Sequence, residues 1–175
     1  MKKKVAPLII IFALIVGLGF GFNFFSKNGD FILTSAISVD QSHFENGNKM
    51  YLGYTLKWEG IGSVILEKVE FIRDDRSIVA KVDDDFQIES YIAETNTIGS
   101  MDEESVRDQG LDEELSPLKG KKVDDNFRLV LGATFNGEDT KNDISMMRIT
   151  YKKLGMTHYR EVPMDSGIIM DEENS

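Results

Sequence analysis

The side chains that could do chemistry in this chain are carboxylates, because thirty Asp and Glu residues stand beside two histidines and no cysteine. Without cysteine there are no disulfides, thiol nucleophiles, iron–sulfur ligands or thiolate zinc sites. His43 lies in a polar stretch and His158 beside Tyr159 and Arg160, and no G-x-S-x-G motif accompanies either. We interpret both histidines as surface residues and expect neither a Ser-His-Asp catalyst nor a cofactor.

Calcium is the metal ion that clustered carboxylates favour, since it takes roughly six to eight oxygen ligands. The strongest cluster in the sequence combines Asp102 and Glu104 with Asp112 and Glu114. The chain contains no EF-hand loop pattern, however. These four residues are therefore weak calcium candidates, and the sequence assigns no metal site.

Paired carboxylates could also hydrolyse glycosidic bonds. With thirty acids many pairs arise by accident, and the runs Asp74-Asp75 and Asp83-Asp84-Asp85 flank short apolar segments as solvated turns do. A carboxylate-dependent hydrolase acting on cell-envelope glycans remains an alternative function. A deep cleft that holds two convergent carboxylates, one with a perturbed pKa, would favour it.

The charge distribution excludes nucleic acid as a partner. Three lysines, Lys2 to Lys4, precede every acid in the chain, and the remaining residues carry 17 bases against 30 acids, a net charge of -13. Such a surface repels phosphate backbones, which bind proteins through lysine and arginine.

An apolar run from Val5 to Phe25 follows the three lysines, with Asn23 as its one polar residue. As a helix it would span roughly 30 Å, the thickness of a bilayer core. A cleavable signal peptide is the alternative, but its apolar region is shorter and ends at a small-x-small site. We expect an uncleaved transmembrane anchor that contacts membrane lipid. Its lipid-facing residues include Val5, Leu8, Ile11, Leu14, Phe20 and Phe25.

The flanking charges predict the orientation of the anchor. Three lysines precede the helix and only Lys27 follows closely, which places the N-terminus in the cytoplasm. The chain is then a single-pass cell-membrane protein with an extracytoplasmic C-terminal domain. The absence of cysteine and the Lys-, Ile-, Asp- and Asn-rich composition favour a Gram-positive bacterial source.

Beyond the anchor, apolar residues recur with a period of two, which is typical of half-buried strands. The clearest runs are Met50 to Glu59 and Phe127 to Asn136. In the second run Leu131 should face the core and Arg128 the solvent. Weaker runs cover 31–39, 64–72, 78–82, 86–92, 144–151 and 157–164.

Seven or eight short strands predict a mainly β domain over residues 26–170, an antiparallel immunoglobulin-like β-sandwich preceded by one N-terminal transmembrane helix. An antiparallel barrel is the main alternative. Residues 1–4 would form a cytoplasmic basic stub and residues 171–175 a disordered tail.

A long acidic insertion, residues 94–125, breaks the alternation. Ser100 and Glu103 match a capping box and Gly110 a helix end, which predicts a helix over Met101–Gln109. We expect the insertion to lie outside the sandwich, so that a Gly/Ser linker in place of Ser100–Lys121 would leave a folded domain. The alternative is that three leucines cap an open end of the sandwich: Leu111, Leu115 and Leu118.

These observations predict a membrane-tethered extracytoplasmic binding or accessory module of unknown ligand, which is not a catalyst. Its partner would be another envelope or membrane protein. A sensor or inhibitor of another membrane protein is a further alternative, acting through the anchor or the acidic insertion.

Overall fold

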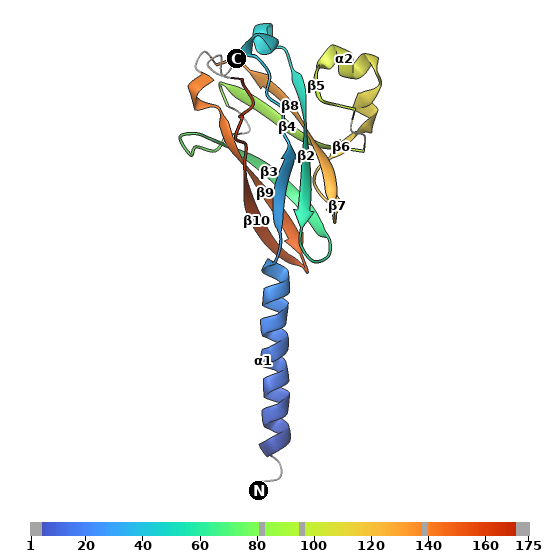
Figure 1. Ribbon diagram of the computed structural model, residues 1–175, viewed down its shortest axis with the longest axis vertical. Helices are drawn as coiled ribbons and strands as arrows, with labels where there is room; N and C mark the ends of the chain where they lie inside the picture. The colour runs from blue at the N-terminus through green and yellow to red at the C-terminus, as the bar shows by residue number, and fades with distance from the viewer. Residues whose placement is uncertain (1–4, 81–82, 95–96, 138–139, 171–175) are drawn as a thin grey trace.

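The computed structural model describes residues 5–80, 83–94, 97–137 and 140–170, with side chains from Phe12 onward except at residue 141. Within these residues the protein is mainly β: two antiparallel sheets pack against each other, and a helix leaves one end (Figure 1). The end beside the helix is called the base, and the opposite end of the sandwich is called the distal end. The predicted mainly β, antiparallel domain is confirmed.

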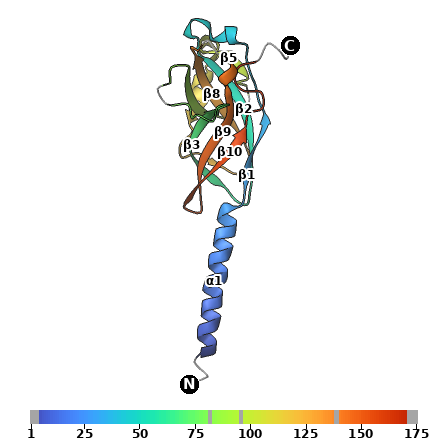
Figure 2. The ribbon, with the colours of Figure 1, turned by 90° about the vertical axis from the view of Figure 1, so that its left-hand side faces the viewer.

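Helix α1 (Val5–Lys27) comprises 23 residues and stands clear of the sheets (Figure 2). Among the described residues, no helix is both long and apolar enough to cross a membrane. Only Asn28 and Gly29 separate α1 from the first strand.

The first sheet has the strand order β1-β2-β8-β4-β6, and β5 also pairs with β2. The second sheet has the order β10-β9-β3-β7. The strands of the first sheet are β1 (Asp30–Ser35), β2 (Met50–Glu59), β4 (Phe86–Ala93), β5 (Ser100–Asp102), β6 (Leu115–Pro117) and β8 (Asn126–Phe135). Those of the second are β3 (Val64–Arg73), β7 (Lys122–Val123), β9 (Ile144–Lys153) and β10 (Met156–Pro163).

The main core lies between the two sheets and is built by the predicted alternation. On β2 the residues of one face are at most 4% exposed, from Met50 through Tyr54 to Trp58. On β8 Leu131 is fully buried, as predicted, and from the second sheet Tyr151 packs against Trp58 with ring centroids 5.3 Å apart. Period-two burial therefore locates this core correctly.

A second, smaller core covers the outer face of the first sheet, where the sequence predicted solvent. Tyr51 of β2 and Val130 of β8 point outward and are 8% and 0% exposed. They pack against Ile98, Val106 and Leu111 from the acidic insertion. The insertion covers part of this face, which explains why the outward-facing Tyr51 and Gly53 of β2 are buried as well.

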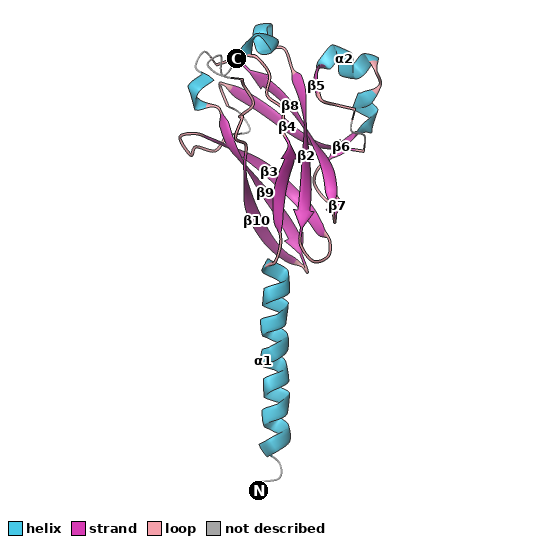
Figure 3. Cartoon of the chain, viewed as in Figure 1, coloured by secondary structure: helices cyan, strands magenta, loops and turns pink. Residues whose placement is uncertain are grey.

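The insertion runs as a strap across this face, from one edge of the sheet to the other. After β4 the chain forms β5 at the β2 edge, then two short helices, and then β6 at the β4 edge. It continues through β7, which pairs with β3 of the other sheet, and Leu118 enters the main core. The two helices are α2 (Glu103–Asp108) and η3 (Leu111–Glu114). The insertion, with its two short helices (Figure 3), thus lies largely outside the space between the sheets, but it packs on the first sheet and adds Leu118 to the main core.

Strand pairing also shortens the predicted helix. Ser100 was expected to cap it, but Ser100 and Met101 pair with β2 as part of β5. The cap is instead Asp102, whose carboxylate accepts a hydrogen bond from the Ser105 amide at 2.7 Å. Gly110 follows the helix in the left-handed conformation, as predicted.

Arg128 was predicted to face solvent, but the structure places it differently. Its guanidinium lies under the strap and donates hydrogen bonds to the Ile98 carbonyl at 2.5 Å and to Thr55 Oγ1 at 2.7 Å. Burial lowers the pKa of Arg128. The side chain thus ties the insertion to β2.

Two predicted strands differ from the observed ones. Of the predicted run 31–39, only the part up to Ser35 forms a strand, and its pairing with β2 shifts register between Leu33 and Ser35. Val39 makes an isolated parallel bridge with Ile169. The run 78–82 forms no strand within its described residues: Ile78 makes an isolated bridge with Ile72, and Lys81 and Val82 lie outside the described residues.

Candidate binding face at the distal end

Three loops meet at the distal end, together with the segment that follows β10 (Figure 1). The loops join β1 to β2, β3 to β4 and β8 to β9. Antiparallel pairing brings them together: Met50 at the start of β2 lies opposite Ala133, and Phe86 at the start of β4 lies opposite Phe135. Loops carried on a rigid sandwich are where binding residues concentrate.

A short helix, η2 (Gln41–Gly47), shapes the first of these loops. Asp40 begins it by accepting a hydrogen bond from the Ser42 amide at 2.8 Å. The chain then turns through Asn46 and Gly47, whose φ angles are 61° and 72°. Asn and Gly tolerate this left-handed conformation, which lets the chain turn back toward β2 here.

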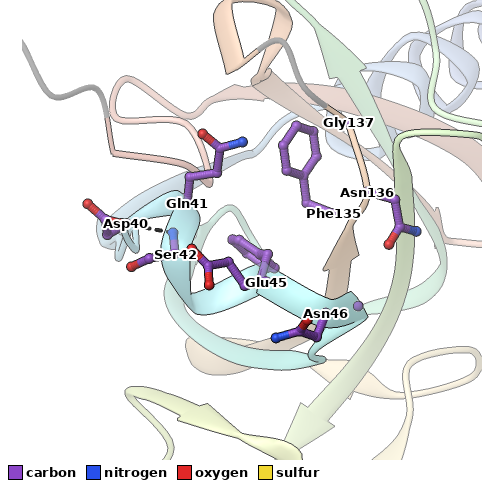
Figure 4. A pocket seen from close by; sticks show the side chains of 10 residues that line it. Asp40, Gln41, Ser42, Glu45, Asn46, Phe135, Asn136 and Gly137 are labelled. Atoms are coloured by element: carbon purple, nitrogen blue, oxygen red, sulfur yellow. Dashed lines mark hydrogen bonds between the residues drawn. The ribbon is translucent and has the colours of Figure 1, made fainter.

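A pocket of about 540 Å³ lies between η2 and the end of β8 (Figure 4). Phe44 and Phe135 supply its apolar surface, with ring centroids 6.3 Å apart. The rest of the lining is polar or glycine: Asp40, Gln41, Ser42, Glu45, Asn46, Gly47, Asn136 and Gly137.

This lining can accept hydrogen bonds and attract positive charge. Hydrogen bonds from Ser42 lower the pKa of Asp40, so this carboxylate is ionised at neutral pH. Glu45 is exposed beside it, and neither lysine nor arginine belongs to the residues that line the pocket. The arrangement suits an ammonium or guanidinium group.

The same end of the molecule concentrates the acidic charge of the domain. The distal loops contain two cations with described side chains, Lys49 and Arg76, and Arg73 lies at the end of β3. Arg73 pairs with Asp83 at 2.5 Å and with Asp85 at 3.3 Å. The described carboxylates of the distal loops and the segment after β10 are Asp40, Glu45, Asp74, Asp75, Asp83, Asp84, Asp85, Asp143 and Asp165.

Asp143 differs from the others because it is 8% exposed. Its two oxygens accept hydrogen bonds from three backbone amides, those of Ile144, Ile168 and Ile169, at 2.6 to 2.8 Å. Burial raises the pKa of Asp143, and these hydrogen bonds act in the opposite direction. The carboxylate holds the C-terminal segment against the start of β9.

Asp143 also lines a second distal pocket, of about 670 Å³, together with Asp74 and Asp165. The negative charge of Asp74 adds to the effect of burial on the pKa of Asp143. A pocket with several carboxylates and one raised pKa is the feature that would favour a hydrolase. Both oxygens of Asp143 are already engaged by the backbone, which leaves this carboxylate poorly placed for acid–base chemistry.

A third pocket, of about 750 Å³, lies between β3 and β4, where the two sheets part. Its described lining is mostly apolar and includes Val69, Phe71, Ile88 and Leu118. Residues 81 and 82, which follow the lining residue Ala80, lie outside the described part of the chain. This cleft offers apolar contact and no cluster of catalytic groups among its described residues.

The predicted calcium candidates lie on the strap. Asp102 caps α2, Glu104 lies in its first turn, and Asp112 and Glu114 belong to η3. Hydrogen bonds from Ser105 lower the pKa of Asp102. Within the described residues, no group of three or more His, Cys, Asp or Glu side chains could hold a metal ion.

The predicted anchor residues all lie in α1, and those with described side chains are exposed: Leu14 by 61%, Phe20 by 80% and Phe25 by 47%. The two histidines lie apart. His43 is exposed on η2, whereas His158 stacks on Tyr151 at a centroid distance of 5.7 Å near the base.

The sequence analysis predicted neither of the two distal pockets. The walls of the first come from segments about 90 residues apart, and no local pattern links them. Comparison of the chain with protein-family models, with curated proteins and with solved structures finds no match in any of the three.

Proposed function

We propose that the protein is a membrane-tethered, extracytoplasmic binding module that presents its acidic distal end to a cationic partner. One observation carries the proposal: an apolar helix leaves one end of the sandwich (Figure 1), and nine described carboxylates lie in the loops and the segment after β10 at the opposite end. The domain is not a catalyst in this proposal, and the partner is a basic surface of another envelope or membrane protein.

The apolar character of α1 supports the anchor. Its exposed large side chains do not form a single stripe, and a helix that is apolar on all sides is stable in a lipid environment. The lysines before the helix favour a cytoplasmic N-terminus in the cell membrane. The exposed large apolar side chains of α1 are Phe12, Leu14, Ile15, Val16, Leu18, Phe20, Phe22, Phe24 and Phe25.

Strand order supports an immunoglobulin-like sandwich. An immunoglobulin constant-type domain pairs strands A-B-E-D in one sheet and G-F-C in the other. Here β1-β2-β8-β4 and β10-β9-β3 follow that order. The strap is inserted between β4 and β8, which take the places of strands D and E. The core lacks the disulfide of antibody domains, and the tryptophan lies on the second strand, at Trp58, instead of the third.

The topology of the proposal can be tested in cell membranes. The full chain should remain in the membrane fraction, and its C-terminus should be cleaved by protease added from outside. A soluble, secreted product that lacks the apolar run would contradict the anchor, and protection of the C-terminus would contradict the orientation.

The binding proposal can be tested on the full chain in lipid nanodiscs with an oligolysine peptide as the probe. The variant Asp40→Asn/Glu45→Gln should weaken binding and reduce its salt dependence, because it removes two charges from the pocket. The matched control Asp112→Asn/Glu113→Gln removes the same charge from the strap. Equal losses in the two variants would mean that net charge alone attracts the peptide, and the distal pocket would have no role.

The alternative is a hydrolase acting on envelope glycans, and the pocket that combines Asp74, Asp143 and Asp165 favours it. Incubation of the full chain with purified cell-wall glycan, with release of reducing ends as the readout, tests this function. Release that Asp74→Asn abolishes would support the hydrolase over the binding module.

A further inference from the structure

Two tight turns flank the point where α1 joins the domain (Figure 2). In the turn between β2 and β3, a β-carbon built on Gly60 would lie 2.9 Å from the α-carbon of Gly29. In the turn between β9 and β10, Lys153 donates a hydrogen bond from Nζ to the Asn28 carbonyl. Both turns therefore lie beside the two residues that connect the helix to β1.

Each turn exposes one large apolar side chain. Ile61 is 59% exposed and Leu154 is 56% exposed. Tight turns usually carry Gly, Asn, Asp or Ser at such positions. Leu154 has a φ of 50°, a left-handed conformation that is unfavourable for leucine. An apolar contact outside the domain would account for both side chains.

Cations surround this junction. Arg160 donates hydrogen bonds to the carbonyls of Lys27 at 2.8 Å and Gly29 at 3.1 Å. Lys27 is exposed beside Arg160, whereas Lys153 is only 3% exposed, and Arg160 forms an ion pair with Asp30 at 3.8 Å. The junction therefore presents two accessible cations, Lys27 and Arg160, beside the carboxylates of Asp30 and its register partner Glu59.

The connection between α1 and β1 has no slack. Two residues reach about 7 Å when fully extended, and the carbonyls of both are held by Lys153 and Arg160. If α1 spans the bilayer as proposed, the base must rest at the membrane surface.

We propose that the base of the domain is a membrane-contact surface that rests on the outer leaflet. Ile61 and Leu154 insert at the boundary between headgroups and acyl chains, and Lys27 and Arg160 lie at the level of the lipid phosphates. This inference rests on the proposed anchor, and it adds the contact that fixes how the domain stands on the bilayer.

The experiment uses the absence of cysteine, which allows single labelling sites in the full chain. Ile61→Cys and Leu154→Cys are labelled with an environment-sensitive fluorophore and reconstituted in vesicles that contain nitroxide-labelled lipid. Both sites should show blue-shifted emission and severalfold stronger quenching than Asn46→Cys on the distal end. Anionic lipid should strengthen both the blue shift and the quenching relative to zwitterionic lipid, because it attracts Lys27 and Arg160.

A fourth site separates this inference from the anchor. Leu14→Cys lies within α1 and should be quenched whenever the helix is in the bilayer. Quenching at Leu14 with water-like emission at both turns would overturn the membrane-contact surface and leave the anchor intact. Water-like emission at Leu14 would overturn the anchor itself. Shielding of the turns in native membranes but not in pure lipid vesicles would show a protein partner in place of lipid.

Discussion

Leu111→Ala tests whether the acidic strap belongs to the cooperative fold. Leu111 is 7% exposed and packs in the second core against Tyr51 and Val130. Removal of a buried leucine side chain costs about 2–5 kcal/mol, and the lower half of this range applies to a small core at the surface. We therefore expect a loss of about 2–3 kcal/mol, which lowers the melting temperature by about 5–10 °C for a domain of this size.

The assay is thermal and denaturant unfolding of the full chain in detergent, followed by far-UV circular dichroism. Leu154→Ala is the matched control, because it makes the same change at a side chain that is 56% exposed. It should change stability by less than about 0.5 kcal/mol. If Leu111→Ala behaves like Leu154→Ala, the strap does not contribute to the folded domain and the second core has no energetic role.

The remaining predictions concern the main core, the C-terminal segment and the base. Leu131→Asp should abolish cooperative unfolding of the domain, because it buries an unpaired charge at a cost of several kcal/mol. Gly167→Ala should destabilise the domain by about 1–3 kcal/mol, because the new β-carbon would lie 2.0 Å from Asp143 Oδ2 at a φ of +62°. Retained wild-type stability in a denaturant titration would contradict the Asp143 contact. Burial, and then the charge of Arg160, lower the pKa of His158 from its usual value of 6.5. The unfolded chain then binds this proton more tightly, so the contribution to stability is present above about pH 6.5 and is lost as the pH falls through the folded pKa. When the pH is lowered from about 7.5 to 5, the His158→Gln variant should therefore lose less stability than the wild-type chain. Equal losses would contradict a lowered pKa of His158.

The strands of the main core could be predicted because their burial follows a local rule. Strand β2 occupies the residues predicted for it, since every second side chain from Met50 to Trp58 faces the other sheet. The outer face of the same strand could not be predicted. Gly53 looked like a solvent-facing position, yet a β-carbon there would lie 2.1 Å from the Ile98 carbonyl of the strap. That contact depends on a segment about 45 residues away, which no periodicity encodes.

In the candidate site, too, some features follow from local sequence and others depend on distant segments. The acidic loops could be predicted from runs such as Asp83 to Asp85, because charged residues between strands are exposed at the ends of a sandwich. The burial of Asp143 could not, because two of its donors, Ile168 and Ile169, lie 25 and 26 residues further along the chain. A carboxylate in an acidic loop becomes a structural group only when distant backbone amides reach it.

The acidic distal end and the short junction between α1 and β1 together bear on the orientation of the proposed module. A flexible linker would let the domain tumble, and the acidic loops would then meet the membrane as often as a partner. Here the two connecting residues are held by Lys153 and Arg160, so with the proposed anchor the base would face the bilayer and the distal end would face away from it. In this proposed arrangement, anionic lipid would attract Lys27 and Arg160 at the base and repel the carboxylates at the opposite end, so both forces would favour the same orientation. In the proposed function, the pocket between η2 and β8 is held at the greatest distance from the membrane that the domain allows, where a cationic surface of a partner can reach it.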